Sequence, residues 1–152
     1  MSTVDDAKKE LAAPIITPKT EALIEAMYIA AHADDDFGAK EREHFVRNVV
    51  GLGGGAIKPD EVKAVLLKLK GKSREGRAAR LKTLGPRLPR PADKEHAFAL
   101  ACSMALADGI VLDEEKQFVD ELAGSLGIAQ DRADTILDEL KALEPDEEAP
   151  HA

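Results

Sequence analysis

The amino-acid sequence predicts an all-α fold, a compact single domain of about seven helices. The first observation is composition: the 152 residues include 25 Ala and 17 Leu but only 8 Val and 8 Ile. Ala and Leu favour helices, whereas β-branched residues favour strands. The second observation is that 44% of the residues are apolar, which is enough for one core. The third is a pattern that occurs twice, which predicts two pseudo-symmetric helix–hinge–helix halves.

The first predicted helix covers residues 18–33 and the second covers 39–50. Thr17 is a good N-cap for the first, because its hydroxyl can accept a hydrogen bond from the first turn, and a proline follows where a helix needs no backbone N–H. Nearly every residue in 22–33 is apolar, so this helix should be buried on all sides. The glycines of 51–55 end the second helix.

A third helix begins at Pro59, where apolar residues follow at helical spacing. These residues are Val62, Val65, Leu66 and Leu69. Ser73 is a candidate cap for a short fourth helix, which runs to about Leu84 and is closed by a Gly-Pro pair. The proline-rich segment 86–91 then leads to the second half of the chain.

Three more helices are predicted after this segment. The fifth covers 93–107 and is apolar over most of its length apart from Ser103. Asp113 is a good N-cap for the sixth, which ends at Gly127. The seventh covers 130–143 and has one apolar face.

The two halves align when the chain is shifted by 74 residues, which places segment 31–45 on segment 105–119. Four positions are then identical: Ala31, Ala33, Asp34 and Glu41 match Ala105, Ala107, Asp108 and Glu115. One pair of helices cannot bury its own apolar face, so the repeat predicts two related pairs packed face to face.

The matching carboxylates Asp34, Glu41, Asp108 and Glu115 are the candidate metal ligands. Each Asp is expected at the carboxyl end of a buried helix, where its charge adds to the negative end of the helix dipole and favours a cation. Clustered carboxylates suit a divalent ion such as Ca²⁺ or Mg²⁺. Asp36 and Asp113 are possible additional ligands. The alternative is that these residues are ordinary helix-start and turn residues.

A basic segment, Lys58–Arg90, carries a net charge of +8, against −16 for the rest and −8 overall. Its candidate partner-binding residues are Lys72, Arg74, Arg77, Arg80 and Lys82. An acidic protein or an anionic membrane would be its partner in a metal-free interaction domain, and the alternative is a solvated face balanced by the chain's own acid. The overall negative charge and the scarcity of aromatic residues argue against nucleic acid. No small-molecule substrate is identified.

The sequence also leads to predictions for the two ends of the chain, its location, its single cysteine and its lack of enzymatic activity. Residues 1–13 are predicted to be a flexible tail and 145–152 an acidic disordered tail, with a helical domain over 14–144. The start shows no secretory apolar region, which makes a cytoplasmic location the default. Cys102 is expected to be a buried thiol, and no catalytic residue set is visible, so we expect no enzyme; a metal-dependent hydrolase is the remote alternative.

The chain resembles the tellurite-resistance TerB family at its two acidic hinges. The residues that carry the resemblance are Ala107-Asp108-Gly109 followed by Glu115, and Ala33-Asp34 followed by Glu41, although Asp35 replaces the glycine in the first copy. The resemblance implies a pseudo-symmetric helical domain with an acidic surface for a divalent metal. It also implies a metal-binding or adaptor role in tellurite or related chemical stress, in the cytoplasm or at the membrane's inner face, with other stress-response proteins as partners.

Overall fold

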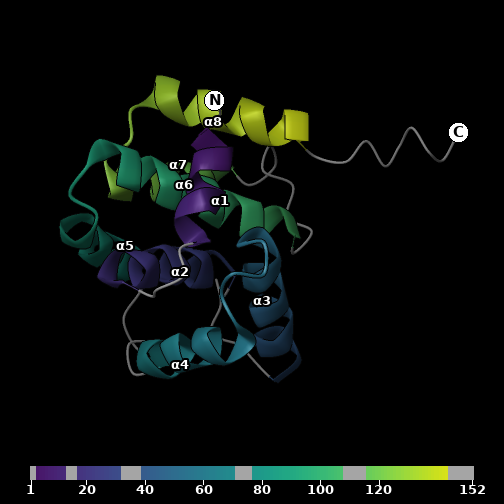
Figure 1. Ribbon diagram of the computed structural model, residues 1–152. Helices are drawn as coiled ribbons and strands as arrows, with labels where there is room; N and C mark the ends of the chain where they lie inside the picture. Colours follow the sequence, from purple (N-terminus) through teal and green to yellow (C-terminus); the bar gives the residue numbers. More distant parts are fainter. Residues whose placement is uncertain (1–2, 13–16, 32–38, 71–76, 108–115, 144–152) are drawn as a thin grey trace, which may run out of the picture.

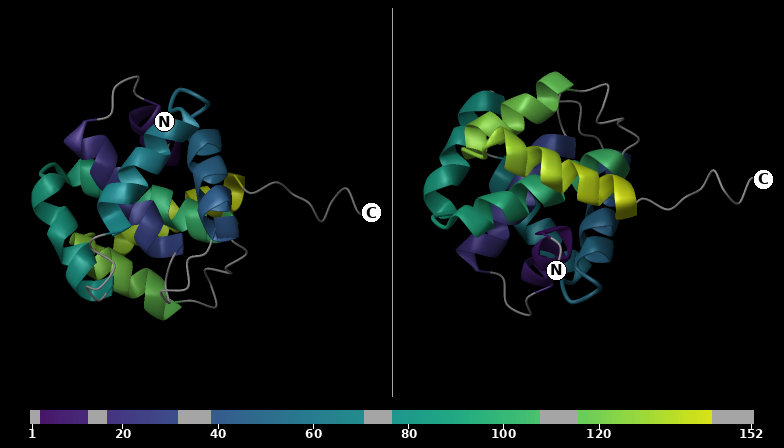
Figure 2. Two further views of the ribbon diagram at one scale, coloured as in Figure 1. Left: turned by 90° about the horizontal axis from the view of Figure 1, so that it is seen from below. Right: turned by 90° about the horizontal axis from the view of Figure 1, so that it is seen from above.

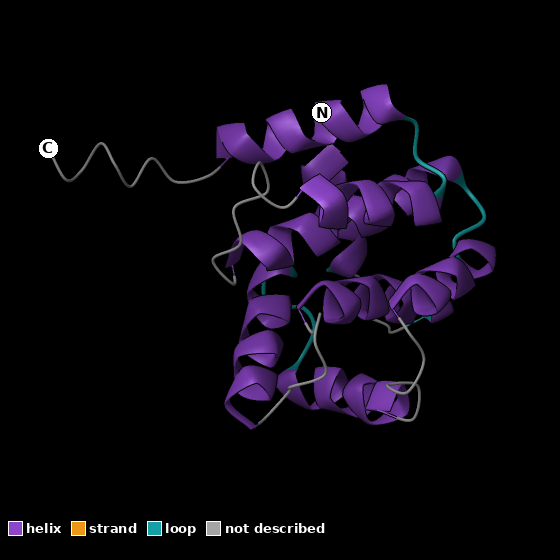
Figure 3. Ribbon diagram, turned by 180° about the vertical axis from the view of Figure 1, so that it is seen from behind, coloured by secondary structure: helices purple, strands orange, loops and turns teal. Residues whose placement is uncertain are grey.

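The computed structural model in Figure 1 describes residues 3–12, 17–31, 39–70, 77–107 and 116–143. In these ranges it contains eight α-helices and one 3-10 turn, and Figure 3 shows no strand in this part of the chain. The helices are α1 (Thr3–Leu11), α2 (Pro18–Ala31), α3 (Ala39–Leu52), α4 (Pro59–Lys70), α5 (Arg77–Leu84), α6 (Pro91–Ala107), α7 (Lys116–Leu126) and α8 (Gln130–Leu143), and the 3-10 turn is η1 (Gly85–Arg87). The predicted all-α fold is confirmed.

Local hydrogen bonds explain where two of the helices begin. The backbone N–H of Thr20 donates to Thr17 Oγ1 over 3.1 Å, so Thr17 caps α2 as its sequence position predicts. Glu61 reaches back in the same way at the start of α4, where the backbone N–H of Lys58 donates to its Oε1 over 2.8 Å. These bonds satisfy backbone groups that have no partner within the helix itself.

The core is built around α2 and α6, which make the most extensive contact between any two helices of the described chain. Both helices are buried on nearly all sides, as shown by Leu23 and Met27 on α2 and by Phe98 and Leu100 on α6, which are fully inaccessible to solvent. Burial of each such side chain stabilises the fold by about 1.5–3 kcal/mol. Among the described helices, none combines the length and apolar character needed to cross a bilayer.

α2 and α6 run in the same general direction across the molecule, from left to right in Figure 1, and the two views of Figure 2 agree. The other helices surround them, with α3 and α4 on one side and α8 on the opposite side. Because the two central helices are oriented alike, their carboxyl ends lie toward the same side of the fold.

The helices that follow the central pair end in the same way. The last residues of α3 and α7, Leu52 and Leu126, are separated by the 74 residues of the sequence repeat. A glycine with a left-handed backbone comes soon after each: Gly54, two residues after Leu52, with φ of 67°, and Gly127, directly after Leu126, with φ of 75°. The next backbone N–H then bonds the carbonyl five residues earlier, over 3.0 Å after α3 and 2.9 Å after α7. Both helices therefore end in a Schellman motif, which requires a residue that tolerates positive φ.

The predicted flexible tail covers residues 1–13, and for residues 3–11 the prediction is wrong. Residues 3–11 form α1, which packs on α6 and α8 and buries Val4, Ala7 and Leu11. These three residues recur at spacings of three and four, so they share one face of the helix. The charged residues between them occupy the opposite face, which hid the pattern in the sequence.

Polar contacts hold the amino end of α1. Arg132 on α8 donates to the hydroxyl of Thr3 over 3.2 Å and also pairs with Glu95 of α6 over 2.8 Å. The N–H of Val4 donates to Glu139 over 3.2 Å. Residues of α8 therefore bond to the start of α1, and one of them, Arg132, also joins α8 to α6.

Candidate functional site

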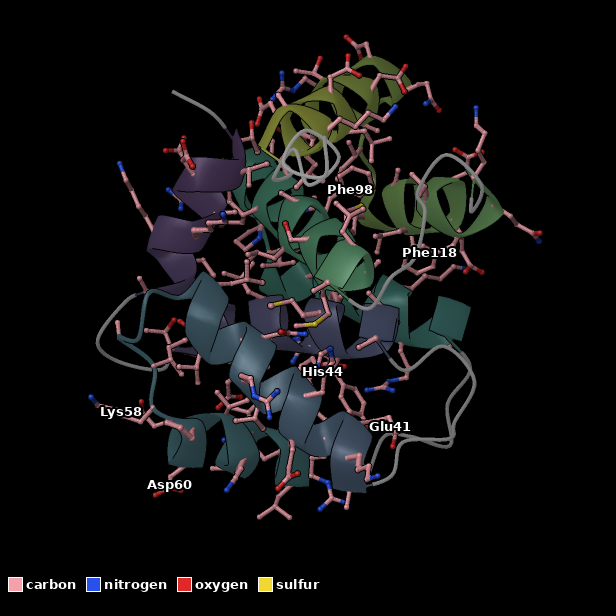
Figure 4. All side chains as sticks on the ribbon, turned by 90° about the vertical axis from the view of Figure 1, so that its right-hand side faces the viewer. Glu41, His44, Lys58, Asp60, Phe98 and Phe118 are labelled. Atoms are coloured by element: carbon pink, nitrogen blue, oxygen red, sulfur yellow. The ribbon has the colours of Figure 1, made fainter. Side chains whose placement is uncertain are left out.

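Most of the predicted metal ligands cannot be placed. Asp34, Asp108 and Glu115 lie outside the described residues, and so do the possible additional ligands Asp36 and Asp113. Glu41 lies in the first turn of α3 with an exposed side chain, as Figure 4 shows. Within the described ranges, no three His, Cys, Asp or Glu side chains are grouped closely enough to hold a metal ion. The metal site therefore remains a prediction.

The helices beside the two hinges are described, and they bear on this prediction. α2 and α6 place their carboxyl ends toward the same side of the fold, and neither helix has a basic residue in its last turn. The carboxyl end of a helix carries a partial negative charge of about half a unit. Both ends therefore contribute negative potential to this side of the fold, which favours a cation.

The structure corrects one of the predicted partner-binding residues. Arg80 is only 4% exposed, so its guanidinium is not available to a partner at the surface. Lys82, on the same helix, is exposed. Lys72, Arg74 and the side chain of Arg77 lie outside what the structure describes.

Several basic residues of the segment Lys58–Arg90 are paired with carboxylates of the chain itself. Lys68 donates to Glu21 of α2 over 2.8 Å. Arg90 makes two hydrogen bonds, of 2.9 and 3.1 Å, to the carboxylate of Asp93 in the first turn of α6. These ion pairs partly neutralise basic side chains that a partner would otherwise contact at the surface.

Asp93 illustrates how strongly one of these pairs acts. Its side chain is 3% exposed and also lies 3.8 Å from Lys19 at the start of α2. The hydrogen bond from Arg90 holds the pKa of Asp93 below its ordinary value, and the charge of Lys19 acts in the same direction, although burial opposes both. Asp93 therefore stays ionised and joins the starts of the two central helices.

A buried carboxylate and the side chains around it form a group that was not predicted from the sequence. We call it the Glu25 cluster, and its members are Glu25, Tyr28, Arg80 and Arg87. Glu25 lies on α2 and is fully buried. Arg87 of η1 donates from Nη2 to Glu25 Oε1, and Nη2 of Arg80 on α5 lies 3.8 Å from Glu25 Oε2. The guanidinium carbon of Arg80 also lies 5.2 Å from the centre of the Tyr28 ring, which is a cation–π contact.

The cluster joins elements from separate parts of the chain. Tyr28 packs its ring edge-to-face against Phe45 of α3, with ring centres 5.8 Å apart and an angle of 86° between planes. α2, α3, α5 and η1 therefore meet at this one group. The signal in the sequence was Glu25 itself, a charged residue in an otherwise apolar stretch, because a buried charge requires a partner of opposite sign.

Cys102 has no feature of a reactive thiol. It is fully buried in α6, and burial raises its pKa to about 12. We expect this thiol to react with Ellman's reagent on the order of 1000-fold more slowly at pH 8 in the folded chain than in the urea-unfolded chain, because the nucleophile is the thiolate. Equal rates in the two samples would contradict the burial described here.

Comparison with known proteins gives no match: a scan against protein-family models, a search of curated proteins and a search of solved structures each find none. Two places carry chemistry beyond packing, namely the carboxyl ends of α2 and α6 and the Glu25 cluster.

Proposed function

We propose that this chain is a non-enzymatic, divalent-cation-binding module of the TerB-like kind that acts in a chemical-stress response such as resistance to tellurite. The proposed ligands are Asp34, Glu41, Asp108 and Glu115, and the proposed ion is Ca²⁺ or Mg²⁺. The module would act in the cytoplasm or at the inner face of the membrane, as an adaptor for other stress-response proteins. The observation that carries the proposal is the shared direction of α2 and α6.

The segments that follow these two helices are acidic. Residues 32–38 contain three Asp, and residues 108–115 contain two Asp and two Glu. Because the carboxyl ends of α2 and α6 lie toward the same side, the two acidic segments start from the same side of the fold. These seven carboxylates and the two negative helix ends add up to a large negative charge, which a bound cation would offset.

The residue types decide which cation is expected. The acidic segments offer carboxylate oxygens and no cysteine. Ca²⁺ and Mg²⁺ prefer oxygen ligands, whereas soft ions prefer sulfur. A hard divalent ion is therefore the occupant that this chemistry favours.

Calorimetric titration of the full chain with CaCl₂, MgCl₂, MnCl₂ and ZnCl₂ tests the proposal. We expect Ca²⁺ or Mg²⁺ to bind with a dissociation constant below about 1 mM. Combining Asp34→Asn with Asp108→Asn is expected to weaken binding by about tenfold or more, because each removed charge belongs to a proposed ligand.

The matched control combines Asp60→Asn with Asp120→Asn, which removes the same charge from exposed positions on α4 and α7. We expect this control to bind as the unmodified chain does. The site assignment is wrong if no ion binds below millimolar concentration, or if the two double variants behave alike. The same metal-loaded samples are expected to show no turnover on a panel of phosphoesters, and turnover would favour the hydrolase alternative.

A further inference from the structure

The Glu25 cluster contains more positive than negative charge. Arg80 and Arg87 contribute two guanidinium groups, and Glu25 is the carboxylate that faces them both among the described residues. The side chain of Arg80 is 5% exposed and that of Arg87 is 31% exposed. Arginine stays protonated in proteins, so the excess charge cannot be removed by loss of a proton.

The hydrogen bonds of the cluster are also incomplete. Nε and Nη2 of Arg80, and Nε of Arg87, are buried and have no acceptor within the described part of the chain, and the buried Oε2 of Glu25 beside them accepts from none of these donors. Nη2 of Arg80 lies 3.8 Å from Glu25, which is near enough for charge attraction but too far for a hydrogen bond. Buried N–H donors nearly always have an acceptor. An acceptor of negative charge would satisfy both deficits.

The arrangement of the ring and the guanidinium groups limits what this acceptor is. Tyr28 covers a face of the Arg80 guanidinium, so the N–H groups that lie in its plane remain the donors. Planar forks of N–H groups match the oxygen atoms of a carboxylate, phosphate or sulfate, and a tetrahedral oxyanion offers more oxygen atoms to the three donors than a carboxylate does. The partly exposed Arg87 provides contact with solvent, whereas the burial of Arg80 restricts the ligand to a small one.

We propose that Arg80 and Arg87 bind a small tetrahedral oxyanion, phosphate or sulfate, beside Glu25 at the junction of α2, α5 and η1. The anion would accept from the three unsatisfied donors and balance the excess positive charge. The ligand of this site is opposite in charge to the proposed cation, and the residues of the site are none of the proposed cation ligands.

Titration calorimetry of the full chain with sodium phosphate tests the proposal, in a chloride buffer of constant ionic strength that contains EDTA. The EDTA removes metal ions, so phosphate held by a bound cation is not counted. Sodium sulfate and sodium acetate form the other two arms. We expect saturable binding of phosphate or sulfate at one site per chain, and much weaker binding of acetate.

Arg87→Gln is the decisive variant, because its half-buried side chain can be changed with less risk to folding than that of Arg80. We expect it to weaken phosphate binding by about 10- to 100-fold, the effect of losing a hydrogen bond from a charged donor. Arg47→Gln, which removes an exposed arginine of α3, is the control and is expected to have no effect. Absence of saturable binding, equal binding of acetate, or equal effects of the two variants would each overturn the proposal.

Discussion

Replacement of Glu25 by Gln is expected to lower the free energy of unfolding by about 3–5 kcal/mol, because it removes the carboxylate from a buried ion pair and leaves its partners uncompensated. Glu25 is fully buried, and Arg80 is nearly so. Arg87 can move toward solvent, but Arg80 cannot do so without opening the contact between α2 and α5. Urea denaturation followed by circular dichroism measures the loss.

Glu21→Gln provides the control for this prediction. Glu21 lies one turn earlier on α2 and also forms an ion pair, with Lys68, but that lysine side chain is 66% exposed. Exposed pairs contribute about 0–1 kcal/mol, so this variant should unfold at nearly the same urea concentration as the unmodified chain. If the two variants lost the same free energy of unfolding, burial would not explain how much Glu25 contributes to stability.

Leu11→Ala is expected to lower the free energy of unfolding by about 2–5 kcal/mol, the usual cost of a cavity at a fully buried leucine. Leu11 is the last residue of α1 and is inaccessible to solvent. It reaches the turn after α3, where a Cβ built on Gly53 would lie 3.6 Å from Leu11 Cγ. Its loss therefore weakens the contact of α1 with several helices at once.

Lys9→Ala is the matched control, since it shortens an exposed side chain on the same helix. We expect it to change stability by less than about 0.5 kcal/mol. Thermal unfolding of both variants, together with limited proteolysis near the amino terminus, distinguishes a docked helix from a flexible tail. In a flexible tail, Leu11→Ala would be as harmless as Lys9→Ala.

Helices with a strong pattern were predictable to within a few residues. α8 has the bounds that its periodicity predicts, and α2 begins at the proline that follows Thr17. These features depend on neighbouring residues alone, because capping and helical spacing are local. α1 was missed for a related reason: with nine residues it presents only three apolar positions, and its stability comes from packing on α6 and α8.

The candidate sites were harder to predict, because they depend on contacts between residues that are far apart in the sequence. Arg80 lies in a basic segment, and only the packing of α5 on α2 shows that it faces Glu25 rather than solvent. The direction of α6 relative to α2 likewise depends on the long connection between them, so spacing along the chain could not predict it. The ligand residues Asp34 and Asp108 were predicted from the repeat, and their assignment stays a prediction.

The single tyrosine of this chain gives a fluorescence signal from one known position. The chain has one tyrosine and no tryptophan, and that tyrosine is Tyr28, which lies under Arg80 and against Phe45. Its tyrosine emission therefore comes from a single place, the Glu25 cluster, and no tryptophan of the chain obscures it. Tyrosine fluorescence can therefore follow unfolding at the junction of α2, α3 and α5, or the binding of an oxyanion there, without an added label.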